Sequence, residues 1–417
     1  MIEPKLRFKA DDGSQFPDWN EKTFNDVADY KKGPFGSALK KEIFVPKSND
    51  TVKVYEQQNA ISKDWKLERY FVTNEYFQSK MKSFAVSGGD IIVSCAGTIG
   101  EMYELPHDAE EGIINQALMR VRIKKSVINS MIFRCVFDKM ISTEGVKISN
   151  GSALKNIPPF ADMKKQSVFV PSLPEQQKIA EFLSTIDTVI EKQKETVSAW
   201  EERKKGVMQK LFGQEVRFKA DDGSDFPEWE EKKIDDVATC FAGATPSTKI
   251  PEYWEEGTIR WMSSGEVNNG QIHDTEKRIS QLGFDKCSTK MVKPNSVVMA
   301  LAGQGKTRGM VAITRVPLCT NQSLCAIETN DDICDDYLYQ YLQTQYNNLR
   351  LISSGDGTRG GLNLKLVGGY VVVVPCLAEQ QKIADCLSSL DEVIEKQKAT
   401  LAAWEELKKG LLQQMFV

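Results

Sequence analysis

Histidine is scarce in this sequence, and its cysteines form no metal-ligand pattern. Only His107 and His273 are present, and the nine cysteines include no CxxC pair. A zinc site of ordinary spacing needs several such ligands close together, and general acid–base catalysis uses histidine most often. Most cysteines stand in apolar strings, such as Cys95 in IIVSCAG, where an unpaired cysteine is usually a small buried hydrophobe. We therefore expect no metal site and no histidine-based catalysis.

Long apolar runs are also missing. The longest run outside a helical pattern is YVVVV at Tyr370, far short of the roughly 20 residues that a membrane-spanning helix needs. The N-terminus lacks the apolar stretch of a signal peptide. Mean hydropathy is -0.38 and 41% of residues are hydrophobic. We expect a soluble cytoplasmic protein with no membrane partner.

The sequence has no strong excess of either charge. Its 54 basic and 58 acidic residues give a net charge of -4. Nonspecific binding to a polyanion depends on many contacts between cations and phosphates, so this balance argues against that mode. Local basic stretches remain, including RVRIKK at Arg120, although solvated surface charge is the simpler interpretation of each.

What the chain does contain is an internal repeat. LRFKADDGSQFPDW at Leu6 recurs as VRFKADDGSDFPEW at Val216, and EQQKIAEFLSTID at Glu175 recurs as EQQKIADCLSSLD at Glu379. Between these segments the match is faint but in register, as in INQALMRV and TNQSLCAI. One unit of roughly 205 residues is therefore written twice, with near-identical ends and a diverged middle, and the length fits two domains.

The last part of each unit predicts a long helix. Apolar positions recur in alternating steps of four and three, a heptad seam that is typical of a coiled coil. Two near-identical seams favour pairing with each other, parallel or antiparallel, although an amphipathic helix packed on its own domain has the same pattern. The seam positions are Ile179, Leu183, Ile186, Ile190, Val197 and Trp200, and in the second helix Ile383, Leu387, Leu390, Ile394, Leu401 and Trp404.

Polar residues interrupt both seams at equivalent positions. Gln193 and Lys204 in the first helix correspond to Gln397 and Lys408 in the second. Such residues fix the register of paired helices at some cost in stability. The linker after the first helix repeats the N-terminal RFKADDG. We therefore expect the N-terminal segment to pack beside the end of the second helix.

The two middles predict mixed α/β domains. Strand-like runs such as DIIVSCAG, SVFVP, SVVMALAG and YVVVVP are separated by Gly, Asn, Ser and Pro. No catalytic motif is complete. GQGKT at Gly303 lacks the leading glycine of a phosphate-binding loop, because Ala300 stands there, and NIPPF at Asn156 has Ile157 between the amide and the prolines.

Five short loops combine glycine with small hydroxyls and cations, beginning at Gly33, Lys147, Ala244, Ala302 and Ser354. Glycine allows close backbone approach, Ser and Thr bind phosphates, and Arg, Lys and Asn can read base edges. Taken singly, each loop is better explained as a polar surface turn, and only the recurrence of five such loops favours DNA binding. Our candidate DNA-binding residues are Lys40, Lys41, Thr98 and Lys155 in the first unit, and Ser247, Lys306, Arg308 and Arg359 in the second.

Together these features resemble the DNA-specificity (S) subunits of type I restriction-modification enzymes. The resemblance covers the whole chain. It rests on the doubled EQQKIA helix starts, on TPST…PEYW…IRWMSSGEV from Thr245, and on PFGSALKKEIF, VYEQQNAI and SCAGTIG in the first unit. A doubled EQQKIA helix separated by diverged domains is specific to that family, whereas a single copy would be weak.

The resemblance implies an α/β (α+β) fold: two target-recognition domains, separated by two long helices that pair as an antiparallel coiled coil, in a pseudo-twofold internal repeat. The domains would occupy 1–172 and 213–376, and the helices 173–212 and 377–417. Each domain would read one half of a bipartite, asymmetric site in double-stranded DNA, and the helices would set the spacing between the halves.

The resemblance also implies partners. Two methyltransferase subunits would dock on the helices, and restriction subunits would join them. This chain would be non-catalytic and bind no cofactor, with S-adenosylmethionine and ATP/Mg held by the partner subunits. Two other classes remain open on the residues alone: a stand-alone enzyme such as a methyltransferase, and a coiled-coil DNA-binding regulator or scaffold without a modification partner.

Overall fold

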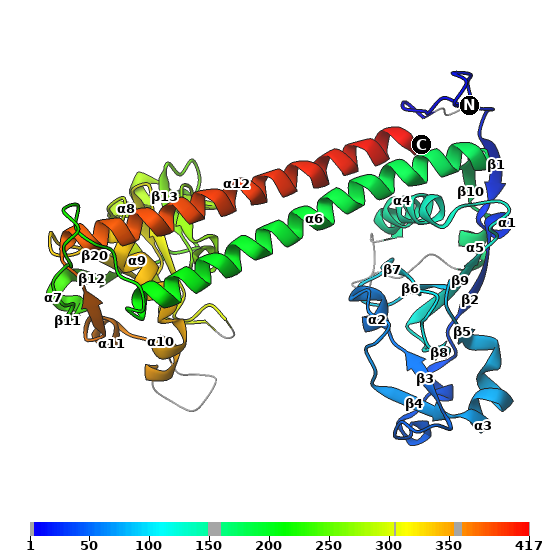
Figure 1. The fold of residues 1–417 in the computed structure, drawn as a ribbon, viewed down its shortest axis with the longest axis horizontal. Coiled ribbons are helices and arrows are strands. Elements are labelled where there is room, and N and C mark those ends of the chain that lie inside the picture. Colours follow the sequence, from blue (N-terminus) through cyan, green and yellow to red (C-terminus); the bar gives the residue numbers. More distant parts are fainter. Residues whose placement is uncertain (1–3, 149–159, 304–305, 354–360, 417) are drawn as a thin grey trace. The chain divides into compact units, whose positions relative to one another are not determined.

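The computed structural model describes residues 4–148, 160–303, 306–353 and 361–416. The chain forms two compact units (Figure 1). Unit 1 consists of Met1–Lys192 with Leu401–Val417, and unit 2 of Gln193–Thr400. Each unit therefore contains one globular domain together with a part of each long helix.

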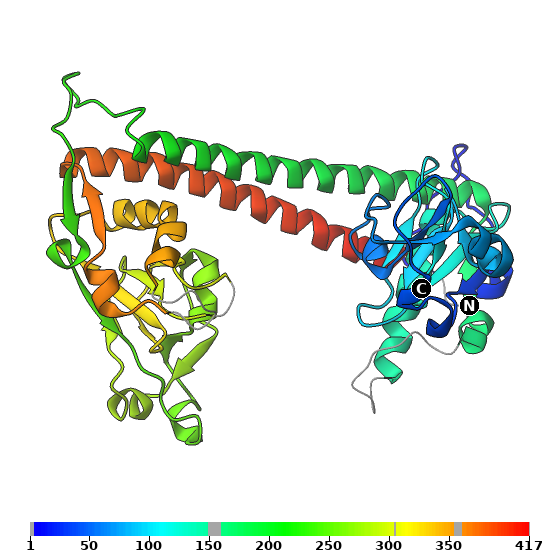
Figure 2. The same ribbon diagram turned by 90° about the horizontal axis from the view of Figure 1, so that it is seen from below.

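The two expected long helices are present as α6 (Leu173–Phe212) and α12 (Leu377–Met415). In unit 1, Ile179 and Leu183 from the start of α6 share a core with Met415 from the end of α12. In unit 2 the relation is reversed, because Leu211 from the end of α6 packs with Ile383 from the start of α12. Within each unit the two helical segments run side by side in opposite directions (Figures 1 and 2), which confirms the antiparallel pairing.

The side chains of the seam lie where the heptad pattern predicts. At the polar interruptions, Gln193 Nε2 donates to Gln397 Oε1 (2.7 Å) and Lys204 Nζ pairs with Asp391 Oδ1 (2.7 Å). The polar interruptions therefore find partners on the opposite helix. Ile179, Leu183, Ile186, Ile190, Val197, Ile383, Leu387 and Ile394 are buried, while Trp200, Leu390, Leu401 and Trp404 are half-buried.

The domain of unit 1 contains two four-stranded sheets and a short two-stranded ladder. The main sheet has the order β2-β9-β6-β7 and is antiparallel; the second has the order β4-β3-β8-β5, with β3 and β8 parallel. The strands are β1 (Asn20–Thr23), β2 (Ala28–Lys32), β3 (Thr51–Tyr55), β4 (Tyr70–Thr73), β5 (Ala85–Val86), β6 (Ile91–Ser94), β7 (Met102–Glu104), β8 (Gly112–Ile114), β9 (Leu118–Ile123) and β10 (Ser167–Val170), which pairs with β1. The α-helices are α1 (Phe24–Val27), α2 (Gln57–Ile61), α3 (Asn74–Tyr76), α4 (Ser130–Ile148) and α5 (Phe160–Lys165).

The domain of unit 2 repeats this topology despite its different sequence. Its main sheet has the order β12-β20-β17-β18, extended by β14, and its second sheet has the order β15-β13-β19-β16, with β13 and β19 parallel. The strands are β11 (Glu230–Lys233), β12 (Ala238–Ala242), β13 (Ile259–Met262), β14 (Gln271–Ile272), β15 (Lys277–Ile279), β16 (Met291–Val292), β17 (Val297–Ala300), β18 (Val311–Thr314), β19 (Leu318–Thr320), β20 (Leu324–Thr329) and β21 (Val371–Val374), which pairs with β11. The α-helices are α7 (Ile234–Val237), α8 (Gln281–Asp285), α9 (Asp335–Thr344), α10 (Tyr346–Ile352) and α11 (Leu364–Gly368).

The main sheet of each domain is buried on both faces. In β6, Ile91 and Val93 pack in the cluster that contains α4, whereas Ile92 packs in a separate cluster on the other face. In β17, Val297 and Val298 divide in the same way. Successive side chains of a strand point to opposite faces, so a strand covered on both sides reads as a continuous apolar run. This explains why apolar and polar residues do not alternate in DIIVSCAG and SVVMALAG.

The repeated RFKADDG segments clamp the long helices in the same manner. The guanidinium of Arg7 binds both carboxylate oxygens of Glu175 (2.9 and 3.0 Å), and Arg217 binds those of Glu379 (2.8 and 3.1 Å). The N–H of Leu6 also donates to the carbonyl of Gln414 near the end of α12 (3.1 Å). The expectation that the N-terminal segment packs beside the end of the second helix is confirmed.

Candidate nucleic-acid interface

Three loops of the unit 1 domain meet at one edge of its main sheet. The end of β2 lies beside the start of β9, and the end of β6 lies on the other side of β9. The N–H of Gly33 donates to the carbonyl of Leu118, and that of Cys95 to the carbonyl of Ala117 (both 2.8 Å). We call residues 33–37, 95–99 and 115–117 loop edge 1.

Unit 2 has the same arrangement. The end of β12 and the end of β17 flank the start of β20, and the N–H of Leu301 donates to the carbonyl of Ser323 (2.8 Å). This bond is the counterpart, 206 residues later, of the one between Cys95 and Ala117. We call the described residues of 243–247, 301–309 and 321–323 loop edge 2.

A turn locked by asparagine stands at the centre of each edge. The Oδ1 of Asn115 accepts from the N–H of Ala117 (3.0 Å), and the Oδ1 of Asn321 accepts from the N–H of Ser323 (3.1 Å). Asparagine favours such turns because its side chain can bond the backbone two residues on. Each turn therefore presents its next residue, Gln116 or Gln322, to solvent from a fixed backbone.

Glycine is required in the loop after β2 and in the equivalent loop after β12, where each loop passes close to the backbone at the Asn turn. A Cβ atom on Gly33 would lie 1.8 Å from the carbonyl oxygen of Asn115, and one on Gly243 would lie 1.9 Å from that of Thr320. No side chain fits at such a distance, which is the physical reason for glycine at both positions. The two domains therefore share a scaffold, although most exposed residues on it differ.

In unit 1, one of the four candidate residues lies on the edge itself. Thr98 is exposed, and its carbonyl accepts a bond from Gln57 Nε2 of α2 (3.4 Å). Lys40 and Lys41 are exposed just after the first loop, where Lys41 opens the 3-10 turn η2 (Lys41–Ile43). Lys155 lies outside the described residues.

In unit 2, three of the four candidates lie on the edge. Ser247 is exposed, and its carbonyl accepts from Trp254 Nε1 (3.2 Å). Lys306 is exposed and Arg308 is half-buried; the carbonyl of Lys306 accepts from the Tyr346 hydroxyl of α10 (2.6 Å). Arg359 lies outside the described residues. The role of all these candidates in DNA binding stays a prediction.

Sequence reasoning missed the residues that the topology places at the centre of each edge. Gln116 and Gln322 stand at the tips of the equivalent turns, and Phe35 is 90% exposed in the first loop. The signal was available for the glutamines, because the Asn-Gln pair recurs at the same place in both diverged middles. For Phe35 there was none, since its exposure depends on the tertiary fold.

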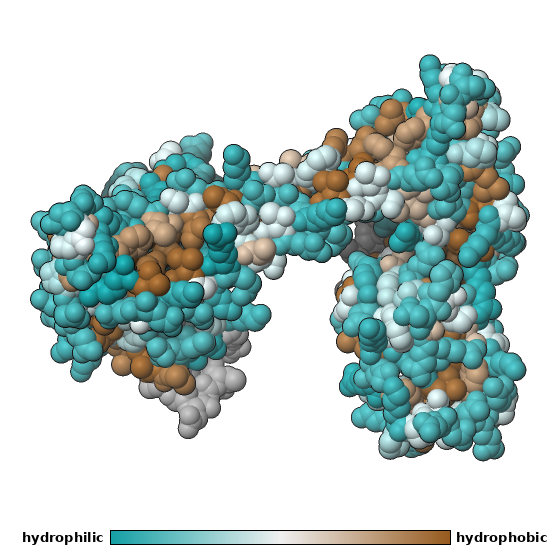
Figure 3. Space-filling model, in the orientation of Figure 1, coloured by the Kyte–Doolittle hydropathy of each residue, from teal (hydrophilic) through white to brown (hydrophobic). Residues whose placement is uncertain are grey.

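The surface near loop edge 2 has an apolar component. Figure 3 shows brown atoms over α10, where Leu351 is 82% and Ile352 is 38% exposed. The cation Lys306 is tied to the same helix through Tyr346. Cationic, hydroxyl-bearing and apolar side chains on neighbouring loops suit contacts with phosphates, base edges and base faces.

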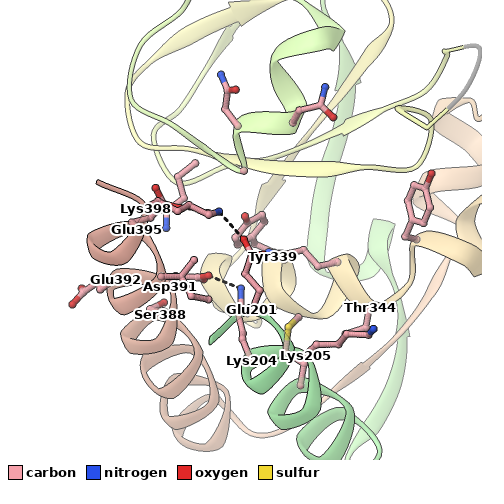
Figure 4. A pocket seen from close by; sticks show the side chains of 18 of the residues that line it. Glu201, Lys204, Lys205, Tyr339, Thr344, Ser388, Asp391, Glu392, Glu395 and Lys398 are labelled. Atoms are coloured by element: carbon pink, nitrogen blue, oxygen red, sulfur yellow. Dashed lines mark hydrogen bonds and ion pairs between the residues drawn. The ribbon is translucent and has the colours of Figure 1, made fainter. Parts of the chain in front are cut away.

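A hollow of about 980 Å³ lies elsewhere in unit 2, between its helical segments and α9 (Figure 4). The pairs Lys204–Asp391 and Lys398–Glu201 cross it. Its lining contains as many carboxylates as lysine and arginine cations: Glu201, Asp391, Glu392 and Glu395 beside Lys204, Lys205, Arg315 and Lys398. The carboxylates would repel phosphates, so this hollow is a poorer candidate for DNA than the loop edges.

The cysteine on loop edge 1, Cys95, is not an activated nucleophile. Burial raises the pKa of the Cys95 thiol to about 12, so it stays protonated at neutral pH and is a poor nucleophile.

Across the described ranges, no three His, Cys, Asp or Glu side chains come together as a metal site. No helix in the described part of the chain is long and apolar enough to cross a membrane.

Fold and surface together define a duplicated α/β protein whose two domains carry equivalent polar loop edges. The family described as type I restriction modification DNA specificity domain matches residues 17–198 and 227–403. The chain therefore belongs to this family, as the sequence resemblance predicted.

Three curated relatives are named as type I restriction enzyme specificity subunits. The type I restriction enzyme MjaIX specificity subunit of Methanocaldococcus jannaschii is 31% identical over 211 residues, which are 49% of this chain and 48% of that protein. The EcoR124I/EcoR124II specificity subunit of Escherichia coli is 25% identical over 39% of this chain and 41% of that protein. The MjaVIII specificity subunit of M. jannaschii is 22% identical over 85% of this chain and 87% of that protein. The chain thus spans less than half the length of the first two relatives in these alignments.

Solved structures share the fold. The type I restriction-modification S subunit from M. genitalium superposes with a TM-score of 0.54 at 17% identity, covering 100% of this chain and 99% of that one. A chain from a study of complex assembly and conformational transition of the type I R-M system gives 0.56 at 15% identity, covering 96% and 98%. At these identities the likeness concerns the fold alone.

Proposed function

We propose that this protein is the DNA-specificity subunit of a type I restriction-modification complex. Each globular domain reads one half of a bipartite, asymmetric site in double-stranded DNA through its loop edge. The duplicated loop edge carries this proposal. One scaffold of strands, glycine and Asn-locked turn is built twice, and exposed residues that differ between the copies stand on it. Two different surfaces on one scaffold suit two different half-sites.

The chemistry of modification and cleavage belongs to partner subunits in this proposal. Two methyltransferase subunits carry S-adenosylmethionine and dock on α6 and α12, and restriction subunits use ATP/Mg. This chain supplies recognition alone and acts on DNA in the cytoplasm. Its small net charge fits such a role, because partner subunits would contribute part of the contact to the phosphates.

The test is co-expression with the cognate methyltransferase subunit, followed by single-molecule mapping of adenine methylation across the genome. We expect a two-part motif with a fixed gap, which disappears when this chain is omitted. The variant Gly243→Val places a side chain against the Thr320 carbonyl, so it should disrupt loop edge 2 and lose the motif. If both proteins are soluble and associated but no new methylation arises, the chain is a regulator or scaffold.

A further inference from the structure

Phe35 is an aromatic residue that the folding of its own domain does not use. Its side chain is 90% exposed, the highest value among the large apolar residues that the structure describes. Phenylalanine is usually a core residue, because removing its ring from water is favourable. Phe35 therefore calls for an explanation outside the packing of unit 1.

The backbone that carries Phe35 is held in place. Pro34 before it is buried, and the Phe35 carbonyl accepts from the N–H of Ala38 (2.8 Å). The carbonyl of Ala38 accepts from the hydroxyl of Tyr76 (2.7 Å), and Leu39 is only 7% exposed. A ring on a fixed backbone can be placed against a partner without a large loss of conformational entropy.

The segment around Phe35, residues 32–42, carries three exposed lysines and one exposed carboxylate, Glu42. Lys32, Lys40 and Lys41 are exposed on either side of it in the sequence, and none forms an ion pair with another described residue. Cations beside a projecting ring match duplex DNA, which offers phosphates to the lysines and base faces to the ring. This charge complementarity favours DNA over a protein partner.

Unit 2 provides an internal comparison. The position equivalent to Phe35 is Thr245, whose hydroxyl bonds Gln322 Oε1 (2.6 Å). The glycine two positions before it, the serine two positions after it and the Asn-Gln turn are the same in both units, whereas the residues directly on either side of it differ. Two domains that read different half-sites should contact DNA through different residues on their shared scaffold. Phe35 and Thr245 are such a pair.

We propose that Phe35 packs between bases of the half-site read by the unit 1 domain and partly unstacks one base step. Apolar side chains that enter a base step loosen its stacking and kink the duplex. Thr245 makes a polar contact at the equivalent place in the other half-site. The proposal rests on the proposed function and adds a residue that contributes to specificity.

The experiment uses the complex of the full chain with its methyltransferase subunits, on duplexes that carry the mapped motif with 2-aminopurine at successive positions. With the wild-type chain, fluorescence should rise at one step of the half-site read by unit 1. Phe35→Ala and Phe35→Thr should abolish this rise and weaken binding about tenfold, while Phe35→Trp should retain both. Thr245→Ala is the matched control and should leave that step unchanged.

Three outcomes would overturn the inference. The first is a fluorescence pattern that Phe35→Ala does not alter. The second is unchanged DNA affinity. The third is loss of assembly with the methyltransferase subunits on size-exclusion chromatography, which would assign Phe35 to a protein contact. If the wild-type complex yields no motif at all, the proposed function itself fails, which is a distinct result.

Discussion

At the scale of single residues, one buried carboxylate holds the start of each long helix. Glu175 and Glu379 have fully buried side chains, and each accepts hydrogen bonds from Nε and Nη2 of one arginine. A buried charge that loses its partner is costly, because nothing replaces the water it has given up. Trp229 Nε1 also donates to Glu379 (3.0 Å), whereas the equivalent nitrogen of Trp19 is buried without a partner.

This difference predicts unequal effects of equivalent substitutions. Arg7→Ala should lower the free energy of unfolding by about 3 kcal/mol, and Arg217→Ala by less, because Trp229 still donates to Glu379. Arg7→Lys should recover only part of the loss, since lysine cannot form the two parallel bonds. Urea unfolding of the three variants measures this. Losses below about 0.5 kcal/mol for Arg7→Ala would show that the clamp contributes little.

The two glutamines at the turn tips give a second prediction at this scale. Gln116 and Gln322 are the same residue on edges where most exposed residues differ, so we expect them to contact a feature common to both half-sites, the phosphate backbone. Alanine at either position should weaken binding to cognate and unrelated DNA alike, without relaxing any base of the motif. Binding measured on a panel of mutated duplexes tests this. Relaxation at one base position would make the glutamine a base reader instead.

At the scale of elements, the paired helices contain two equivalent ion pairs in unequal surroundings. Lys204 and Asp391 have side chains that are 10% and 18% exposed, and Gln340 Nε2 binds Asp391 Oδ2 (2.7 Å). Lys408 and Asp187 are 31% and 36% exposed. Water therefore screens the second pair more.

We expect Lys204→Met to destabilise its unit by about 2 kcal/mol, because it leaves Asp391 poorly solvated. The matched change Lys408→Met should cost less than about 1 kcal/mol. Denaturant unfolding compares the two. Equal losses would contradict the argument from burial.

The helices also predict the spacing of the recognised site. Inserting seven residues between Ile190 and Val197, together with seven at the facing position between Ile394 and Leu401, preserves the heptad seam. Each helix grows by about 10 Å, which corresponds to roughly three base pairs of duplex. Methylation mapping should show unchanged half-sites with a correspondingly longer gap. An unchanged gap would show that the helices do not set it.

At the scale of the whole molecule, the sequence predicted the architecture well because the signals were periodic or duplicated. The heptad seam defined both helices, and the repeated RFKADDG segment predicted that the N-terminal segment packs beside the end of the second helix, where Leu6 bonds Gln414. The apolar runs around Ile91 and Val297 became the doubly covered central strands. These features are local, so they can be read along the chain.

The site was harder to predict because loop edges are made by strand pairing across distant segments. Loop composition predicts Ser247, Lys306 and Arg308, which lie on loop edge 2, and Thr98 of SCAGTIG lies on loop edge 1. The Asn-Gln pair recurs in both units, but its recurrence alone does not mark it as part of a site. The exposure of Phe35 could not be read from its type, which by itself predicts a core position.

The most direct test of the account replaces residues 227–376 with a second copy of residues 17–172. Both junctions fall in repeated sequence, so the helices and clamps are retained. If each domain reads its own half-site and the helices run antiparallel, methylation mapping should give a symmetric motif. The half read by unit 1 should then appear twice, as inverted copies, with the original gap. An asymmetric motif, or the loss of the unit 1 half-site, would contradict recognition by independent domains.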